Sequence, residues 1–201
     1  MDFQIRLSKP EDLEKILELQ ASSLRTLTSS YDSSQIESLI RSQASARLAK
    51  DEIGVVAEYE NEIIGFASVL IQQSLIGGVY VHPDFMRQRL GTQLLEAVEE
   101  IALDKRHKVI YVTSSLAAVN FYQARGYKSI CKSGFYSESK YWIPCVNLKK
   151  QLIIFTETEK WYRHFIFNLK QIFSFILILV IAAFVTIVLP LIISLIASLL
   201  Q

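Results

Sequence analysis

A long uncharged apolar run near the C-terminus constrains the fold more than any other feature. From Ile172 to Leu200 the sequence contains no acidic or basic residue. A helix rises 1.5 Å per residue, so about 20 apolar residues cross a hydrocarbon core of roughly 30 Å. A helix that is apolar on every side needs either a membrane or a large protein around it. A chain of 201 residues cannot supply that protein, so the run predicts one transmembrane helix over residues 171–200.

The flanks of this run predict its orientation. No basic residue follows it, and the five nearest Lys and Arg residues before it are Lys149, Lys150, Lys160, Arg163 and Lys170. Cytoplasmic flanks are enriched in Lys and Arg, so we expect the N-terminal part in the cytoplasm and the C-terminus across the membrane. Proline inside a membrane helix is tolerated with local adjustment, and we expect a kink near Pro190. Residues 151–170 form the juxtamembrane segment of this scheme.

Residues 1–150 have the composition of one globular domain. The chain holds 21 basic and 20 acidic side chains, and nearly all of them precede residue 151. This balance does not point to nucleic acid. The two cysteines and three histidines are scattered, without metal-ligand spacing, so we expect no metal and two reduced thiols. The N-terminus is charged from its second residue, so we expect no signal peptide.

The order of periodic segments predicts a mixed α/β domain. The alternation at 3–7 indicates a strand, and Ser8 with Glu11 fits a capping box before a helix that buries Leu13 and Ile16. A second helix starts near 32–34 and buries Ile36 and Leu48 among others. Further strands are expected at 53–60, 62–72, 75–81, 109–113, 127–131 and 140–148, and further helices at 92–105 and 115–125. We therefore expect a mostly antiparallel central sheet with helices on both faces.

The strand–loop–helix unit at 75–104 is a candidate anion site. Gly77 and Gly78 within the strand indicate a bulge or a close backbone approach. Gly91 stands where the loop turns into the helix, and Arg87 and Arg89 add positive charge beside backbone N–H groups at a helix start. A plain surface loop with solvated arginines is the alternative.

Two motifs, taken in order, resemble the GNAT (GCN5-related N-acetyltransferase) superfamily. The first is Val79-Tyr-Val-His-Pro-Asp-Phe followed by Met86-Arg-Gln-Arg-Leu-Gly91, similar to the family's Q/R-x-x-G-x-G/A loop. The second is Ser115-Leu-Ala-Ala-Val-Asn-Phe-Tyr122 followed by Gly126-Tyr127. The resemblance spans residues 3–149. Met86 stands where the family usually has Gln or Arg. Arg89 stands where it has Gly, and this side chain either contacts a phosphate or crowds it.

The resemblance implies acetyl-CoA as co-substrate and an amine as acceptor. Backbone groups of Tyr80 and Val81 would pair with the pantetheine, and an N–H near Tyr80 would stabilise the oxyanion. N–H groups of the loop would hold the pyrophosphate, and Tyr122 would be the general acid. The implied cofactor-binding residues are Val79, Tyr80, Val81, Arg87, Gln88, Arg89, Leu90, Gly91, Thr92, Ser115 and Tyr122.

The sequence does not identify the base that deprotonates the amine. The strand at 75–81 carries no carboxylate. His82 is one candidate for the base, but a histidine before a proline at a strand end is more often a turn residue. The resulting expectation is a membrane-anchored N-acetyltransferase. The alternatives are a non-catalytic acetyl-CoA-binding or scaffold protein at the membrane, and a self-associating membrane helix that carries a relic domain.

Overall fold

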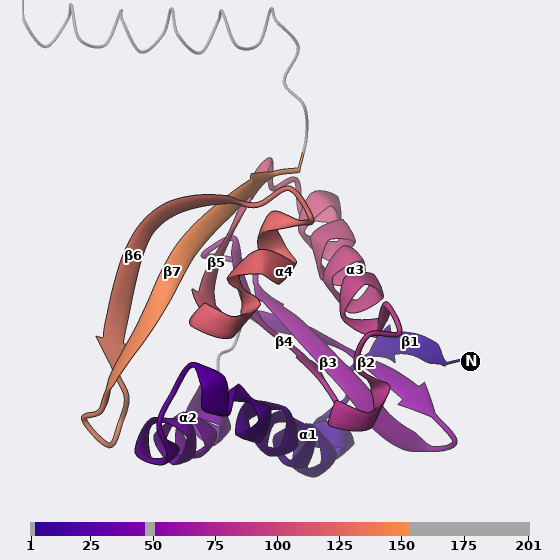
Figure 1. Ribbon diagram of the computed structural model, residues 1–201. Coiled ribbons are helices and arrows are strands. Elements are labelled where there is room, and N and C mark those ends of the chain that lie inside the picture. The colour runs from indigo at the N-terminus through magenta and orange to yellow at the C-terminus, as the bar shows by residue number, and fades with distance from the viewer. Residues whose placement is uncertain (1–2, 47–50, 153–201) are drawn as a thin grey trace, which may run out of the picture. The chain divides into compact units, whose positions relative to one another are not determined.

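A seven-stranded mixed sheet forms the centre of the domain in the computed structural model, which describes residues 3–46 and 51–152 (Figure 1). The strand order is β1-β2-β3-β4-β5-β7-β6, and only the β4–β5 pair is parallel. The strands are β1 (Gln4–Leu7), β2 (Glu52–Tyr59), β3 (Glu62–Leu70), β4 (Leu75–Val81), β5 (Val109–Ser115), β6 (Lys128–Tyr136) and β7 (Trp142–Gln151). The predicted mostly antiparallel sheet is confirmed.

Four α-helices cover the two faces of this sheet: α1 (Leu13–Arg25), α2 (Ser33–Ala46), α3 (Leu90–Asp104) and α4 (Val119–Gln123). Successive residues of β2 show the division, because side chains alternate between faces along a strand. Val55 packs in the cluster that holds the buried face of α3, whereas Val56 packs with Ile16 and Leu19 of α1. Helices on both faces are therefore confirmed.

Local chemistry explains several element boundaries. The β2–β3 hairpin turns through Glu60 and Asn61, whose φ angles of 50° and 67° are those of a two-residue turn that matches strand twist. At the start of α2, the Gln35 N–H donates to Asp32 Oδ1 at 2.8 Å and the Asp32 N–H donates to Gln35 Oε1 at 3.0 Å. This reciprocal capping box satisfies two N–H groups at the helix start.

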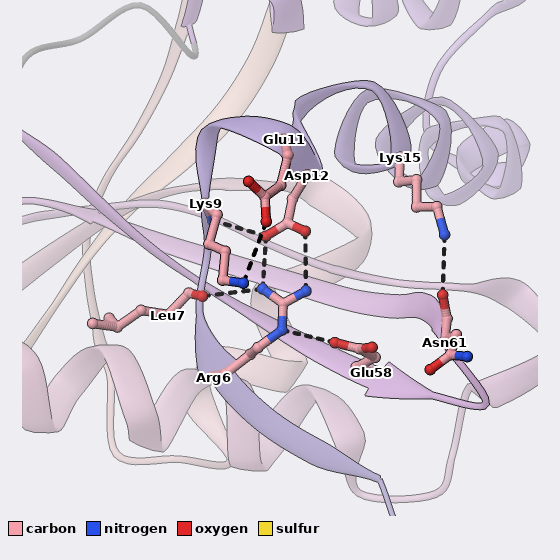
Figure 2. A network of polar contacts seen from close by, with 8 residues as sticks. All are labelled: Arg6, Leu7, Lys9, Glu11, Asp12, Lys15, Glu58 and Asn61. Atoms are coloured by element: carbon pink, nitrogen blue, oxygen red, sulfur yellow. Dashed lines mark hydrogen bonds and ion pairs between the residues drawn. The ribbon is translucent and has the colours of Figure 1, made fainter.

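The capping box expected for Ser8 and Glu11 is wrong by one residue. A 3₁₀ turn at Pro10–Asp12 precedes α1, and Asp12 Oδ2 accepts the Lys9 N–H at 2.8 Å. Arg6 fixes this carboxylate by two parallel hydrogen bonds, at 2.7 and 3.0 Å, and donates its Nε to Glu58 at 2.7 Å (Figure 2). The guanidinium thus joins β1, β2 and the start of α1.

Several other details of the elements differ from expectation. Leu13 is 41% exposed rather than buried, and α3 begins at Leu90, two residues before the predicted Thr92. β6 runs on to Tyr136, well beyond the predicted Cys131. Leu48 lies outside the described residues, as do the predicted juxtamembrane segment from residue 153 and the transmembrane helix at 171–200 with its kink.

The parallel pair at the centre of the sheet is short. β4 and β5 pair only at Leu75 with Tyr111 and at Ile76 with Val112. Beyond these positions the strands diverge, and β5, β7 and β6 turn away from β1–β4 (Figure 1). The opening in the sheet therefore begins at Gly77.

None of the helices within residues 3–46 and 51–152 has the length and apolarity that a membrane span requires.

Replacing Asp12 by Asn should lower the free energy of unfolding by about 1–2 kcal/mol at pH 7, because a charge-assisted pair with Arg6 is lost. Hydrogen bonding to Arg6 lowers the pKa of Asp12. This stabilisation is present above the unfolded pKa, near 4, and is lost as the pH falls through the folded pKa. Urea unfolding should therefore show the two proteins converging below about pH 4. The exposed Glu11→Gln is the control, and equal stability of both variants at pH 7 would contradict the role of Asp12.

Candidate active site

A pocket of about 530 Å³ occupies the opening between β4 and β5. Its walls come from both faces of the sheet, with α1 and α2 residues on one side and α4 residues on the other. The residues singled out in the sequence that line it are Gly77, Gly78, Val79, Tyr80, Val81, Met86, Gly91, Ser115 and Tyr122. The two separate sequence motifs therefore meet at one cavity.

A β-bulge decides which backbone groups of β4 face this opening. The register with β3 pairs Ser68 with Gly78 and Val69 with Ile76, so Gly77 is the extra residue. The predicted bulge is confirmed. The His82 N–H donates to a β3 carbonyl at 2.9 Å. Backbone polar groups alternate in direction along a strand, so Tyr80 also faces β3, while Val79 and Val81 face the opening.

The backbone of Tyr80 therefore faces β3, whereas the family resemblance implied that it would pair with the pantetheine. Its main chain pairs with Phe66 of β3, so it is not available to a ligand. Its side chain lines the pocket instead, and its hydroxyl donates to Gln43 Oε1 of α2 at 3.0 Å. Gln20 Nε2 of α1 donates to the same oxygen at 3.0 Å. This network fixes α1 and α2 against β4.

The loop before α3 forms a concave row of amides. Arg87 and Arg89 have φ angles of 62° and 64°, with Gln88 between them in the ordinary negative region. Such alternation turns successive N–H groups towards one side and creates an anion-binding nest. Among the described residues, the N–H groups from Arg87 to Gly91 have no hydrogen-bond acceptor. Their geometry suits a phosphate or another anion at the start of a helix.

Two expectations for this loop change. Arg89, not Gly91, adopts the left-handed conformation that leads into the helix. A Cβ on Gly91 would lie 3.4 Å from both Phe121 and Val81, which is an ordinary contact distance, so Gly91 lies directly beside the residues that line the opening. The Thr92 N–H already donates to the Arg89 carbonyl at 3.0 Å. Thr92 therefore leaves the set of free amides, and buried Leu90 contributes only its backbone.

Arg125 is a positive residue beside this loop that the sequence analysis missed. Its Nε donates to Thr92 Oγ1 at 3.0 Å, and its guanidinium lies 3.9 Å from the centre of the Phe121 ring. It joins the end of α4 to the first turn of α3. The sequence feature that could have identified Arg125 is its position just before Gly126, which ends the helix with a φ of 88°.

Tyr122, from the second sequence motif, lies in the wall of the pocket. Its side chain is 4% exposed, packs edge-on against Phe121 and Tyr127, and lines the pocket. No described residue forms a hydrogen bond with its hydroxyl. Burial raises the pKa of Tyr122, with a smaller contribution from Tyr80. The group is therefore protonated at neutral pH, where it can donate a proton but cannot accept one.

His82 and Tyr122 are not brought together. His82 lines a different cavity with Phe85, Tyr59 and residues of α1, and it accepts the Asp84 N–H at 3.4 Å, as a turn residue does. Cys131 and Cys145 are free thiols, as expected. Among residues 3–46 and 51–152, no group of His, Cys, Asp and Glu could hold a metal ion.

Glu52 is a second residue that the sequence analysis missed. It begins β2, two strands away from β4, and its Oε1 lies 3.3 Å from where a Cβ on Gly77 would be. Ser68 and Gly77 are small, so the long side chain reaches across β3 to the bulge at the edge of the pocket. No sequence signal marks Glu52, because its reach depends on the register of three strands.

Comparison with known proteins gives one family match and many structural matches. Residues 27–152 match the family described as "Acetyltransferase (GNAT) domain". A GCN5-related N-acetyltransferase of Rhodopseudomonas palustris is 25% identical, with a TM-score of 0.68 over 75% of this chain and 96% of that one. No curated protein matches the chain by sequence.

Two further solved structures share the fold. The PaiA N-acetyltransferase of Thermoplasma acidophilum, in complex with coenzyme A, is 21% identical (TM-score 0.61; 75% of this chain, 99% of that one). YncA of Salmonella typhimurium, with its cofactor acetyl-CoA, is 17% identical (TM-score 0.55; 78% and 97%).

Replacing Arg89 by Gly should raise the free energy of unfolding by about 1 kcal/mol, because glycine adopts positive φ without a Cβ clash. Gln88→Gly is the matched control. It should lower stability, because its φ is negative and the variant adds only unfolded-state entropy. Chemical denaturation of both variants measures the difference. A loss of stability in Arg89→Gly equal to that in Gln88→Gly would show that position 89 is not strained.

Proposed function

The chain belongs to the GNAT acetyltransferase domain family, and from this premise we propose that it transfers an acetyl group from acetyl-CoA to an amine at a membrane surface. The observation that carries the proposal is the opening between β4 and β5, where unpaired backbone groups, an amide nest and a buried tyrosine line one path. These features suit the pantetheine, the pyrophosphate and the thioester in turn, so the residues present fit the co-substrate.

Each part of this path has a defined role in the proposal. Val79 and Val81 offer backbone N–H and C=O groups to the pantetheine, as an added strand would. One of these N–H groups stabilises negative charge on the acetyl oxygen. The amides from Arg87 to Gly91 bind the pyrophosphate, and Ser115 lies at the opposite wall.

The reaction forms a C–N bond and breaks the C–S bond of the thioester, which leaves a thiolate on coenzyme A. Tyr122 donates its proton to that sulfur. Burial raises the pKa of Tyr122, so the hydroxyl is protonated at neutral pH, as a proton donor must be. The hydroxyl has no described protein partner, so it is free to turn towards the leaving group.

Replacing Tyr122 by Phe should lower kcat by about 10²- to 10⁴-fold and leave acetyl-CoA binding unchanged, because only the proton donor is removed. Coenzyme A release in the presence of an amine measures turnover. Tyr127→Phe is the control: it loses a hydrogen bond to Glu99 at 2.8 Å, which affects stability and not the pocket.

Two outcomes would contradict this assignment. Turnover of Tyr122→Phe within twofold of the parent would remove Tyr122 from the chemistry. A parent protein that binds acetyl-CoA but acetylates no amine would favour the non-catalytic alternative, to which Met86 and Arg89 in the family loop already give some support.

The membrane location is a proposal from sequence and rests on the apolar run at 172–200. The full chain should sediment with membranes, and a chain lacking residues 171–201 should remain in the supernatant. Sedimentation of the truncated chain with membranes after a high-salt wash would contradict an anchor in this segment.

A further inference from the structure

One end of the domain gathers the end of β7, the end of α3 and the starts of β5 and β6 (Figure 1). Gln151 of β7 is the cross-strand partner of Val109 of β5. The N–H of Leu152, the last described residue, donates to the Lys108 carbonyl in the α3–β5 connection at 2.9 Å. The described chain therefore stops at this end, before the apolar run at 172–200.

This exit end, which comprises residues 104–109, 127–129 and 149–152, is strongly basic. It holds six Lys and Arg residues and one acidic residue, Asp104, although the net charge of the whole chain is only +1. Lys150 is held in an ion pair with α3. Four of the others are exposed and form no ion pair within the part of the chain that the structure describes, and we call them the basic patch: Lys105, Arg106, Lys128 and Lys149.

The fold itself does not account for all of these charges. Cations are favourable at the C-terminal end of a helix, which explains Lys105 and Arg106 at the end of α3. Lys128 and Lys149, however, lie directly opposite each other on β6 and β7. Like charges directly opposite on neighbouring strands destabilise a sheet. An anion outside the domain would relieve this repulsion.

An exposed tyrosine continues the row of these two lysines. Tyr111 of β5 is the other cross-strand partner of Lys149, and it is 42% exposed. Tyrosine favours the boundary between lipid headgroups and water, because its ring is apolar and its hydroxyl is polar. Cross-strand partners share a face of the sheet, so Lys128, Lys149 and Tyr111 present two cations and one aromatic ring to the same side.

We propose that the exit end docks on the anionic lipid headgroups of the bilayer that holds the proposed anchor, through the basic patch with Tyr111 beside it. This inference rests on the membrane location in the proposed function and not on acetyl transfer. The cytoplasmic leaflet is anionic, and each Lys or Arg near it strengthens binding about fivefold. Such binding is weak and salt-sensitive for a detached domain, but a tether raises the local concentration of the surface.

Docking by the exit end orients the opening between β4 and β5. These strands pair at Leu75 and Ile76, near the exit end, and diverge from Gly77 onwards. The helices α1 and α2 and the turn between β6 and β7 lie towards the other end of the domain (Figure 1). With the basic patch on the headgroups, the opening faces the aqueous phase. Docking therefore leaves the site accessible to co-substrate dissolved in water.

Energy transfer from the domain to labelled lipids tests the docking in the full chain. A donor fluorophore is attached to Cys131, which is exposed, whereas Cys145 is buried. The chain is placed in nanodiscs of phosphatidylcholine alone, or of phosphatidylcholine and phosphatidylserine in equal parts. Transfer should be higher in the mixed discs and should fall to the neutral-disc value in about 1 M salt, where charges more than about 3 Å apart are screened. Equal transfer in both discs at low salt would overturn the inference.

A matched pair of variants assigns the effect to the basic patch. The patch variant carries Gln at its four positions, and in mixed discs it should give the transfer of neutral discs. Each single substitution should lower the ratio of docked to undocked domain about fivefold. The control changes net charge equally at exposed positions on α1, α2 and the β6–β7 turn: Lys15→Gln, Arg25→Gln, Arg41→Gln and Lys140→Gln. An equal loss in this control would show that net charge acts, and not the patch.

Lys128→Glu separates docking from folding. Its carboxylate lies opposite Lys149 and replaces a repulsive pair by an attractive one. The melting temperature of the variant should therefore rise, while its ratio of docked to undocked domain should fall at least about fivefold. A lower melting temperature would contradict the repulsion between the two lysines, and unchanged docking would remove Lys128 from the patch.

The anchor and the patch fail in different ways. A full chain that leaves the discs in a high-salt wash would overturn the anchor and, with it, this inference. A chain that stays in the discs but does not respond to phosphatidylserine would overturn the patch alone. Binding of a fluorescent RNA to the parent in neutral discs, lost in the patch variant, would assign the patch to nucleic acid instead of lipid.

Discussion

The two residue pairs that join β4 to β5 determine the site. Backbone N–H and C=O groups require partners, and where the strands part, those of β4 have none in β5. The bulge at Gly77 then sets which residues offer these groups, because it reverses the alternation along the strand. Val79 and Val81 face the opening for this reason, and Tyr80 is left to place its side chain there. The same divergence gives the pocket access to both faces of the sheet.

Polar bridges hold the two sides of the opening at fixed separation. Arg125 ties α4 to the first turn of α3, and Tyr31 ties the start of α2 to β7 and to the segment after β5. Glu99 of α3 pairs with Lys150 of β7 at 2.6 Å and accepts from Tyr127. Glu99 is buried, so its ion pair is specified by geometry and leaves little room for alternative arrangements. The site is thus formed by elements that cannot separate without losing hydrogen bonds.

Local signals in the sequence were sufficient for most of the fold. Three features depend only on residues a few positions apart: the Glu60-Asn61 turn, the Asp32 cap and the glycine that ends α4. Each could therefore be predicted from the sequence. The family loop and the Phe121-Tyr122 motif located the two walls of the pocket.

Features that depend on the pairing register of the strands could not be predicted from the sequence. The direction of the Tyr80 backbone follows from a bulge, and the reach of Glu52 follows from small residues on two neighbouring strands. The left-handed conformation of Arg89 was not predicted, because Gly91 was expected to make the turn into α3. The cap on α1 moved from Glu11 to Asp12 because Arg6, on β1, holds that carboxylate.

The central claim is that the opening between β4 and β5 receives acetyl-CoA. Calorimetric titration of acetyl-CoA into the full chain tests it most directly, with Gly91→Trp as the blocked variant, since even a Cβ at Gly91 already reaches contact distance of Val81 and Phe121. The account predicts micromolar binding to the parent, of about −8 kcal/mol, and its loss in the variant. Absence of binding to the folded parent, or equal binding to both proteins, would contradict it.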